Sequence, residues 1–176
     1  MTPQDVITFW RGAGAGKWFN GGAGFDAKCR EHFGDAHMAA ARCEHDDWMD
    51  NADGALALLL LLDQIPRNIF RGSGHAFATD GLALQHAKQA VEWGLDMQVD
   101  SDLRAFIYLP FEHCEEMAMQ DRSVELMAPL GQSSLSYAHA HRNVIKRFGR
   151  FPHRNAALGR SNTPEEQAWL DAGGGF

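Results

Sequence analysis

The stretch ALALLLLLDQIPRN, from Ala55 to Asn68, decides the fold of this chain. It opens with an unbroken apolar run, ALALLLLL, whereas a helix at a protein surface carries polar residues on one face. The run is far too short to cross a bilayer, which takes about 20 residues. We therefore expect a helix over Ala55–Leu62 that is buried on all sides in the core of a globular chain.

The same stretch ends in a cluster of polar residues. These are Asp63, Gln64, Arg67 and Asn68, and they straddle Pro66. Because proline cannot donate the helical hydrogen bond, the helix must kink or restart there. Polar groups at the end of so apolar a helix are either helix caps or the wall of a polar pocket, and Asp63 is placed to pair with an arginine.

Helix signals dominate the rest of the chain. TPQD at residues 2–5 and TPEE at residues 163–166 each combine an N-cap threonine, a proline in the first turn and an acidic residue. Alternating stretches typical of strands are scarce. We expect an all-α protein that forms a single domain over residues 1–176.

Further helices are expected in the second half of the chain. They are placed over Leu103–Leu109, over His113–Met127, and from Ser133 or Ser134 to about Gly149. Prolines at positions 110 and 129 are expected to end the first two.

Charge is distributed unevenly. The net charge is −7, which argues against a general nucleic-acid binder or a membrane-surface binder. Residues 126–164, however, contain six Lys and Arg residues and no Asp or Glu. A basic segment in an acidic chain suits one acidic ligand or an internal network of ion pairs better than a polymer.

Cysteine usage and the first residues bear on the compartment. The three cysteines form no CxxC pair, which favours free thiols in a reducing cytosol and gives no support to a structural zinc site. The opening MTPQDVITFW lacks the basic and apolar regions of a signal peptide. We expect a cytoplasmic protein.

A glycine-rich stretch near the start invites a cofactor interpretation. RGAGAGK, residues 11–17, lacks the first glycine of a phosphate-binding loop and has Trp18 where Ser or Thr would follow the lysine. We interpret it as a flexible surface loop. No pattern in the chain identifies a cofactor.

FEHCEE, residues 111–116, is the first candidate for chemistry. On a helix, Glu112 and Glu116 would share one face, and His113, Glu116 and Gln120 another. A histidine beside carboxylates suits general acid–base work. The alternative is a helix N-terminus that favours acidic residues through its dipole. A metal site here would need a further ligand and matches no established spacing.

HAH, residues 139–141, is the second candidate. Residues two apart on a helix point to different faces, so the pair does not suit one metal ion. His141 lies on the apolar side and His139 on the wet side. The alternative to a functional His141 is a core histidine whose hydrogen bonds are satisfied.

RFGRFPHRNAALGR, residues 147–160, is the third. Gly149 can release the preceding helix and Pro152 prevents its return. Phe148 and Phe151 can anchor the turn in the core and hold the arginines in fixed directions. The positive charge then faces either a ligand or the carboxylates of the protein itself.

Three strings together resemble a known family. LLDQIPRN, PFEHCEE followed by Gln120, and YAHAHRNVIKRFGRFPHRNAALGRS with the TPEE helix start are similar to the bacterial domain of unknown function 924. The resemblance spans nearly the whole chain. It implies an all-α fold of TPR-like antiparallel helical hairpins and no established reaction. Cys114 departs from the family pattern, which usually has serine there.

By position, the resemblance singles out fifteen residues. They are Asp63, Gln64, Arg67, Asn68, Glu112, His113, Glu115, Gln120, His141, Arg147, Arg150, His153, Arg154, Asn155 and Arg160. We expect His113 and His141 to be candidates for proton transfer, with Glu112 or Glu115 orienting one of them. The others are expected to bind the ligand, and arginines would supply paired donors.

These residues support a leading hypothesis and two alternatives. The first is a protein, with or without enzymatic activity, that holds a small acidic molecule in a pocket between helices. The second is a TPR-like scaffold that binds an acidic peptide or partner protein. The third is purely structural: the arginines pair with carboxylates and lock the fold together.

Overall fold

The computed structural model describes residues 1–176 and is all-α, as expected from the sequence. The chain forms two compact units. Unit 1 comprises Met1–Arg71 and His75–Pro110, and unit 2 comprises Gly72–Gly74 and Phe111–Phe176. The expectation of a single domain stays a prediction. None of the helices combines the length and apolar character that a membrane span requires.

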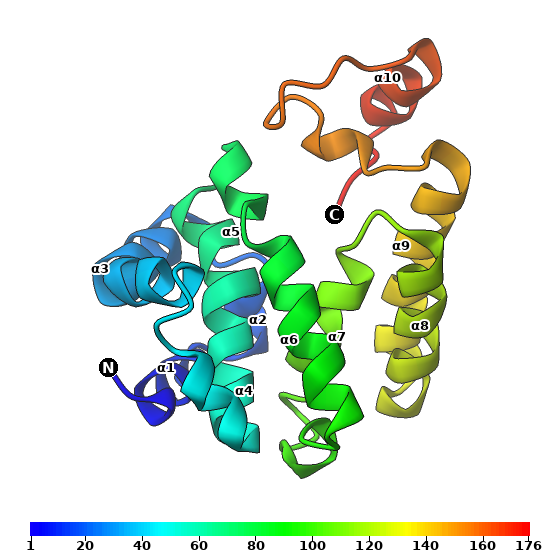
Figure 1. Ribbon diagram of the computed structural model, residues 1–176. Helices are drawn as coiled ribbons and strands as arrows, with labels where there is room; N and C mark the ends of the chain where they lie inside the picture. Colours follow the sequence, from blue (N-terminus) through cyan, green and yellow to red (C-terminus); the bar gives the residue numbers. More distant parts are fainter. The chain divides into compact units, whose positions relative to one another are not determined.

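Unit 1 is built around the apolar helix of the opening stretch (Figure 1). Its helices are α1 (Pro3–Ala13), α2 (Ala15–Trp18), α3 (Gly22–Ala41), α4 (Ala52–Leu59), α5 (Ile65–Ile69) and α6 (Asp80–Glu92). α7 (Ala105–Glu112) begins in unit 1, and its last two residues belong to unit 2. Short 3-10 turns cover Asp46–Asp50 and Asp96–Gln98.

The apolar run Ala55–Leu62 is buried throughout, which confirms the core helix. Beyond α4 the chain widens into a π-helical turn over Leu60–Gln64 before α5 begins. Pro66 explains this turn: it has no N–H, so it cannot donate to the carbonyl of Leu62 four residues earlier. The Thr79 hydroxyl donates to that carbonyl instead, at 2.5 Å. At the predicted helix break, the carbonyl of Leu62 therefore receives its hydrogen bond from the Thr79 side chain at the start of α6.

The glycine-rich stretch near the start of the chain is a helix end and a second short helix, not the expected surface loop. Trp18 explains the difference. Its indole Nε1 donates to the Trp10 carbonyl at 2.7 Å, and its ring packs edge-on against Phe106 with centroids 5.1 Å apart. The contacts of Trp18 thus fix the backbone of a glycine-rich stretch that would otherwise be flexible.

Unit 2 contains a helical hairpin and a C-terminal segment. α8 (Met117–Met127) and α9 (Gln132–Phe148) lie side by side and are joined by a turn over Ala128–Leu130 (Figure 1). A 3-10 turn over Pro152–Arg154 and α10 (Pro164–Asp171) follow. The core consists of buried Val144, Ile145 and Phe151, with Met117, Phe148 and Trp169 packed against them.

Two expected boundaries were wrong. α7 continues through Pro110 to Glu112, so this proline does not end it. The next residues, 113–116, form a non-helical connection, and α8 begins only at Met117. Side-chain hydrogen bonds stabilise the break: the Gln120 amide donates to the carbonyls of Glu112 and Cys114 at 2.6 and 2.7 Å, and the distant Arg160 holds Glu115. Glu112 and Glu116 therefore do not share a helical face.

The other boundaries lie close to those expected. α9 begins at Gln132 with Gly131 as its N-cap, so neither serine caps it. It ends at Gly149, which has φ 71° in the left-handed region that glycine tolerates best. Both predicted N-cap threonines are confirmed, and each completes a capping box: Thr2 with Asp5, and Thr163 with Glu166.

Candidate functional site

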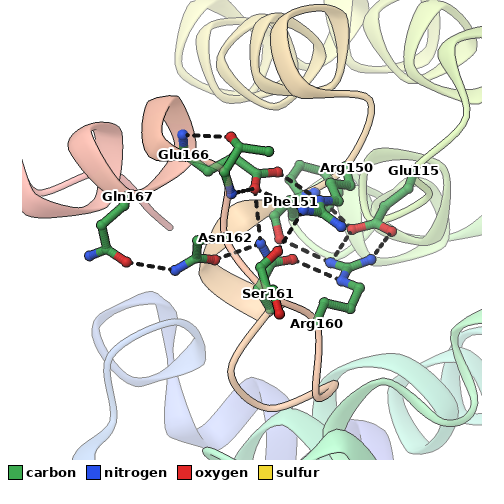
Figure 2. Close-up of polar contacts among 10 residues, drawn as sticks. Glu115, Arg150, Phe151, Arg160, Ser161, Asn162, Glu166 and Gln167 are labelled. Carbon is green, nitrogen blue, oxygen red and sulfur yellow. Dashed lines mark hydrogen bonds and ion pairs between the residues drawn. The ribbon is translucent and has the colours of Figure 1, made fainter.

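The basic segment after α9 turns toward the carboxylates of unit 2. Arg150 donates two hydrogen bonds to Glu166, from Nε to Oε1 at 2.6 Å and from Nη2 to Oε2 at 2.8 Å. The same nitrogen donates to the Ser161 carbonyl at 2.9 Å. Figure 2 shows this pair beside a second one, formed by Arg160 and Glu115. Arg150 is thus held by the start of α10.

The second pair fixes the connection between α7 and α8. Arg160 donates to both oxygens of Glu115, at 2.7 and 2.9 Å, and Asn155 accepts from Arg160 Nε at 2.8 Å. Glu115 also accepts from the Phe151 backbone N–H at 2.7 Å. Burial opposes ionisation, yet the bonds from Arg160 and Phe151 lower the pKa of Glu115 below its usual value. Glu115 is ionised and engaged on both oxygens.

Glu166 combines a helix cap with an ion pair. Its carboxylate accepts from the Thr163 backbone N–H at 2.7 Å, and the Thr163 hydroxyl accepts from the Glu166 N–H. The hydrogen bonds from Arg150, together with that from Thr163, lower the pKa of Glu166 to about 2. Arg147 pairs with Glu165 at 2.9 Å, but both side chains are largely exposed. Carboxylates of unit 2 therefore offset much of the positive charge of the basic segment.

His141 faces the interior of unit 2, as expected, whereas His139 is exposed. Its Nδ1 lies 2.9 Å from the Tyr137 carbonyl and 3.1 Å from Glu112 Oε1. Because a carbonyl only accepts, Nδ1 carries the proton and Nε2 is the acceptor nitrogen of the ring. Glu112 and the Tyr137 carbonyl thus fix both the tautomer and the direction of His141.

The surroundings of His141 keep it neutral. Its side chain is 9% exposed, and burial, followed by the charge of His113, lowers its pKa to about 3. Arg154 adds to the lowering, and its guanidinium lies 4.6 Å from the centre of the Phe151 ring. Phe151 in turn meets His141 edge-on, with centroids 5.6 Å apart. The imidazole is therefore neutral near pH 7, with its proton on Nδ1 and its lone pair on Nε2, and it acts as an oriented hydrogen-bond acceptor.

The remaining predicted residues of unit 2 support this arrangement. The His113 ring lies 6.2 Å from that of His141, and the His153 ring lies 5.6 Å from that of Phe151. Gln120 is buried and joins the α7–α8 connection to α8 through its two carbonyl bonds. Unit 2 therefore gathers eleven of the fifteen residues that the sequence singled out.

The other four belong to unit 1 and form a polar cluster around Arg67. Arg67 lies 3.2 Å from Asp63 Oδ1, which is the pairing expected of Asp63. It also donates to both oxygens of Asp80, at 2.9 and 3.0 Å. Gln64 donates to the Asp63 carboxylate, and Asn68 donates to the Gln64 carbonyl at 3.1 Å. The cluster is held together by its own hydrogen bonds.

Sequence reasoning missed two acidic partners. These are Asp80 in the first turn of α6 and Glu166 in the first turn of α10. Each also receives a bidentate arginine, Arg67 in the first case and Arg150 in the second. The sequence could have indicated both as partners of arginines, because both lie in the first turn of a helix, where the helix dipole favours an acidic side chain. No group of three or more His, Cys, Asp or Glu side chains is placed to hold a metal ion.

Comparisons with other proteins extend these findings. A family model described as "Bacterial protein of unknown function (DUF924)" matches residues 6–174. The chain is also similar to a solved structure, that of the protein of unknown function ATU0120 from Agrobacterium tumefaciens. The two share 50% sequence identity and a TM-score of 0.94, over 97% of each chain. No curated protein matches the chain.

Proposed function

Because this chain belongs to the bacterial DUF924 family of proteins of unknown function, we propose its function from the geometry of unit 2. We propose that unit 2 binds a small acidic molecule at His141, with Arg154 supplying positive charge. His141 accepts a hydrogen bond or a proton from the ligand through Nε2. The observation that carries the proposal is the fixed tautomer of His141, held by Tyr137 and Glu112.

The arginines of the chain differ in how directly their charge acts at His141. Arg67, Arg150 and Arg160 each donate to one or two carboxylates of the protein. Their charge is largely compensated, so they attract an anionic ligand weakly and act mainly to hold the fold. Arg154 is buried and close enough to His141 to lower its pKa. The charge of Arg154 also acts on Glu115, and an anion bound beside His141 would gain from it as well.

The chemistry available at this site is that of a neutral, weakly basic imidazole, because burial lowers its pKa to about 3. An imidazole with a protonated Nδ1 and a carboxylate partner accepts a proton at Nε2, and the carboxylate stabilises the resulting cation. Glu112 occupies the place of that carboxylate, and its side chain is buried. His113 is a second imidazole at the edge of the site. The same groups serve simple binding equally well, because both need an oriented acceptor.

A thermal-shift experiment tests the proposal. Wild type, His141→Gln and Arg154→Gln are each heated with millimolar acetate, succinate, inorganic phosphate and a hexose phosphate. A ligand that binds only the folded state raises Tm. We expect at least one of these anions to raise the Tm of wild type and to have no effect on the two variants.

Arg142→Gln is the matched control, because Arg142 is on α9 but pairs with Asp121 at the surface. It should respond to the anion as wild type does. The proposal is contradicted if none of the anions raises Tm, or if the shift persists in both His141→Gln and Arg154→Gln. A shift caused by an acidic peptide alone would favour the scaffold alternative.

A further inference from the structure

His141, Phe151 and His153 surround an aromatic ring that belongs to the chain itself, and we call the space between them the slot. The Phe176 ring lies face to face with the His141 imidazole, with centroids 3.6 Å apart and an interplanar angle of 12°. Phe151 and His153 meet the same ring edge-on, at 6.1 and 5.7 Å and at 90° and 80°. One stacked face and two edges form a site for a flat ring, since aromatic pairs prefer these geometries.

The glycines before Phe176 direct it into this slot. Gly173 and Gly175 have φ 86° and 145°, conformations that residues with a Cβ rarely adopt. At Gly174 a Cβ would overlap the indole ring of Trp169, and at Gly175 it would lie 3.6 Å from His153 Cβ. Each glycine of the segment thus meets a local requirement of the path that ends on His141.

Phe176 is nevertheless held at the surface. Its side chain is 54% exposed although one face is stacked. About half of the residue is therefore in water already, and only its stacked part is newly exposed when it leaves His141. A residue that fills a slot while half-exposed is suited to be displaced by a ring that fits there better.

We propose that the slot formed by His141, Phe151 and His153 binds a planar aromatic acid, and that Phe176 competes with this ligand for it. The proposal rests on the proposed function for the acidic group, which Arg154 would attract. It adds the flat ring, which the stacked face of His141 would recognise, and the segment Gly173–Phe176 as a built-in competitor.

The experiment is an NMR titration of the full chain with sodium benzoate. Cyclohexanecarboxylate serves as the non-aromatic match, and wild type is compared with Phe176→Ala. Removal of the competing ring should tighten benzoate binding about 2- to 10-fold, the range expected from the loss of one aromatic pair. Cyclohexanecarboxylate should bind more weakly than benzoate to both proteins.

Three further variants test the ring of Phe176, the segment that carries it and the imidazole on which it stacks. Phe176→Trp keeps a stacking ring and should restore the wild-type affinity. Gly175→Ala keeps Phe176 but strains the backbone at φ 145°, so it should tighten benzoate binding as Phe176→Ala does. His141→Leu, which removes the stacked imidazole, should abolish the preference for benzoate.

The outcomes distinguish the two proposals. Equal benzoate affinity in wild type and Phe176→Ala, with binding lost in Arg154→Gln, would overturn the slot and leave the proposed function standing. Benzoate and cyclohexanecarboxylate binding with equal affinity would likewise overturn the aromatic preference. If neither acid binds wild type or Phe176→Ala, the slot is wrong, and the thermal-shift experiment with the other anions decides the proposed function.

Discussion

Gly54 in α4 faces the backbone of Trp48, and a Cβ built there would overlap the Trp48 carbonyl oxygen. A Cβ built at Gly34, in the middle of α3, would meet no neighbouring atom within 4 Å. Both are helical glycines, so their intrinsic cost to a helix is similar. The contrast isolates the effect of the neighbouring backbone.

We predict opposite results for alanine at these two positions. Gly54→Ala should lower the free energy of unfolding by about 1–3 kcal/mol, because rigid backbone must move to admit the methyl group. Gly34→Ala should raise it by about 0.5–1 kcal/mol through helix propensity. Urea unfolding of both variants measures the two changes. Equal effects of the same sign would contradict the packing of Asp46–Asp50 on α4.

Among elements, α10 is held in unit 2 by Trp169, which packs on the core, and by Glu166 of its first turn. Glu166 caps the helix through Thr163 and holds Arg150 with both oxygens. Its neighbour Glu165 makes only an exposed pair with Arg147. Exposed pairs contribute little to stability, because solvent screens them and the side chains lose freedom.

We predict that Glu166→Ala lowers Tm clearly, whereas Glu165→Ala leaves it within experimental error. The first change removes the cap and leaves Arg150 without its carboxylate, and the second removes only a screened contact. Differential scanning calorimetry of the two variants provides the comparison. A matching loss of Tm in both would show that the Arg150–Glu166 pair is not what anchors α10.

Helix ends were predictable where their signals are local, and not elsewhere. TPQD and TPEE begin helices because each cap is completed within four residues. The break at residues 113–116 was missed because distant groups cause it: Glu115 is held by Arg160, 45 positions away in the chain. A pattern of neighbouring residues carries no record of such a partner.

For the whole molecule, the apolar run and the scarcity of strand patterns were enough to predict an all-α chain. The family resemblance identified residues that the structure gathers, eleven of them in unit 2. It could not say which arginines are paired, because Arg150 and Glu166 are 16 positions apart and meet only in the folded chain. The amino-acid composition of the chain also gave no indication of the division into two units.

The pH dependence of stability follows from histidines that the fold keeps neutral. Burial lowers the pKa of His37, His86 and His141, the last to about 3. The unfolded chain takes up protons near the ordinary pKa of about 6.5, whereas the folded chain does not. Their contribution to stability is therefore complete above that pH and is lost as the pH falls from about 6.5 toward the folded pKa.

The most direct test of a neutral, oriented His141 is the free energy of unfolding of wild type and His141→Gln at pH 7.5 and pH 5.0. His37 and His86 contribute equally to both proteins, so the difference between them isolates His141. Wild type should lose about 2 kcal/mol more than His141→Gln over this interval. An equal loss in the two proteins would contradict the lowered pKa of His141, and a smaller loss in wild type would mean that Glu112 raises that pKa instead.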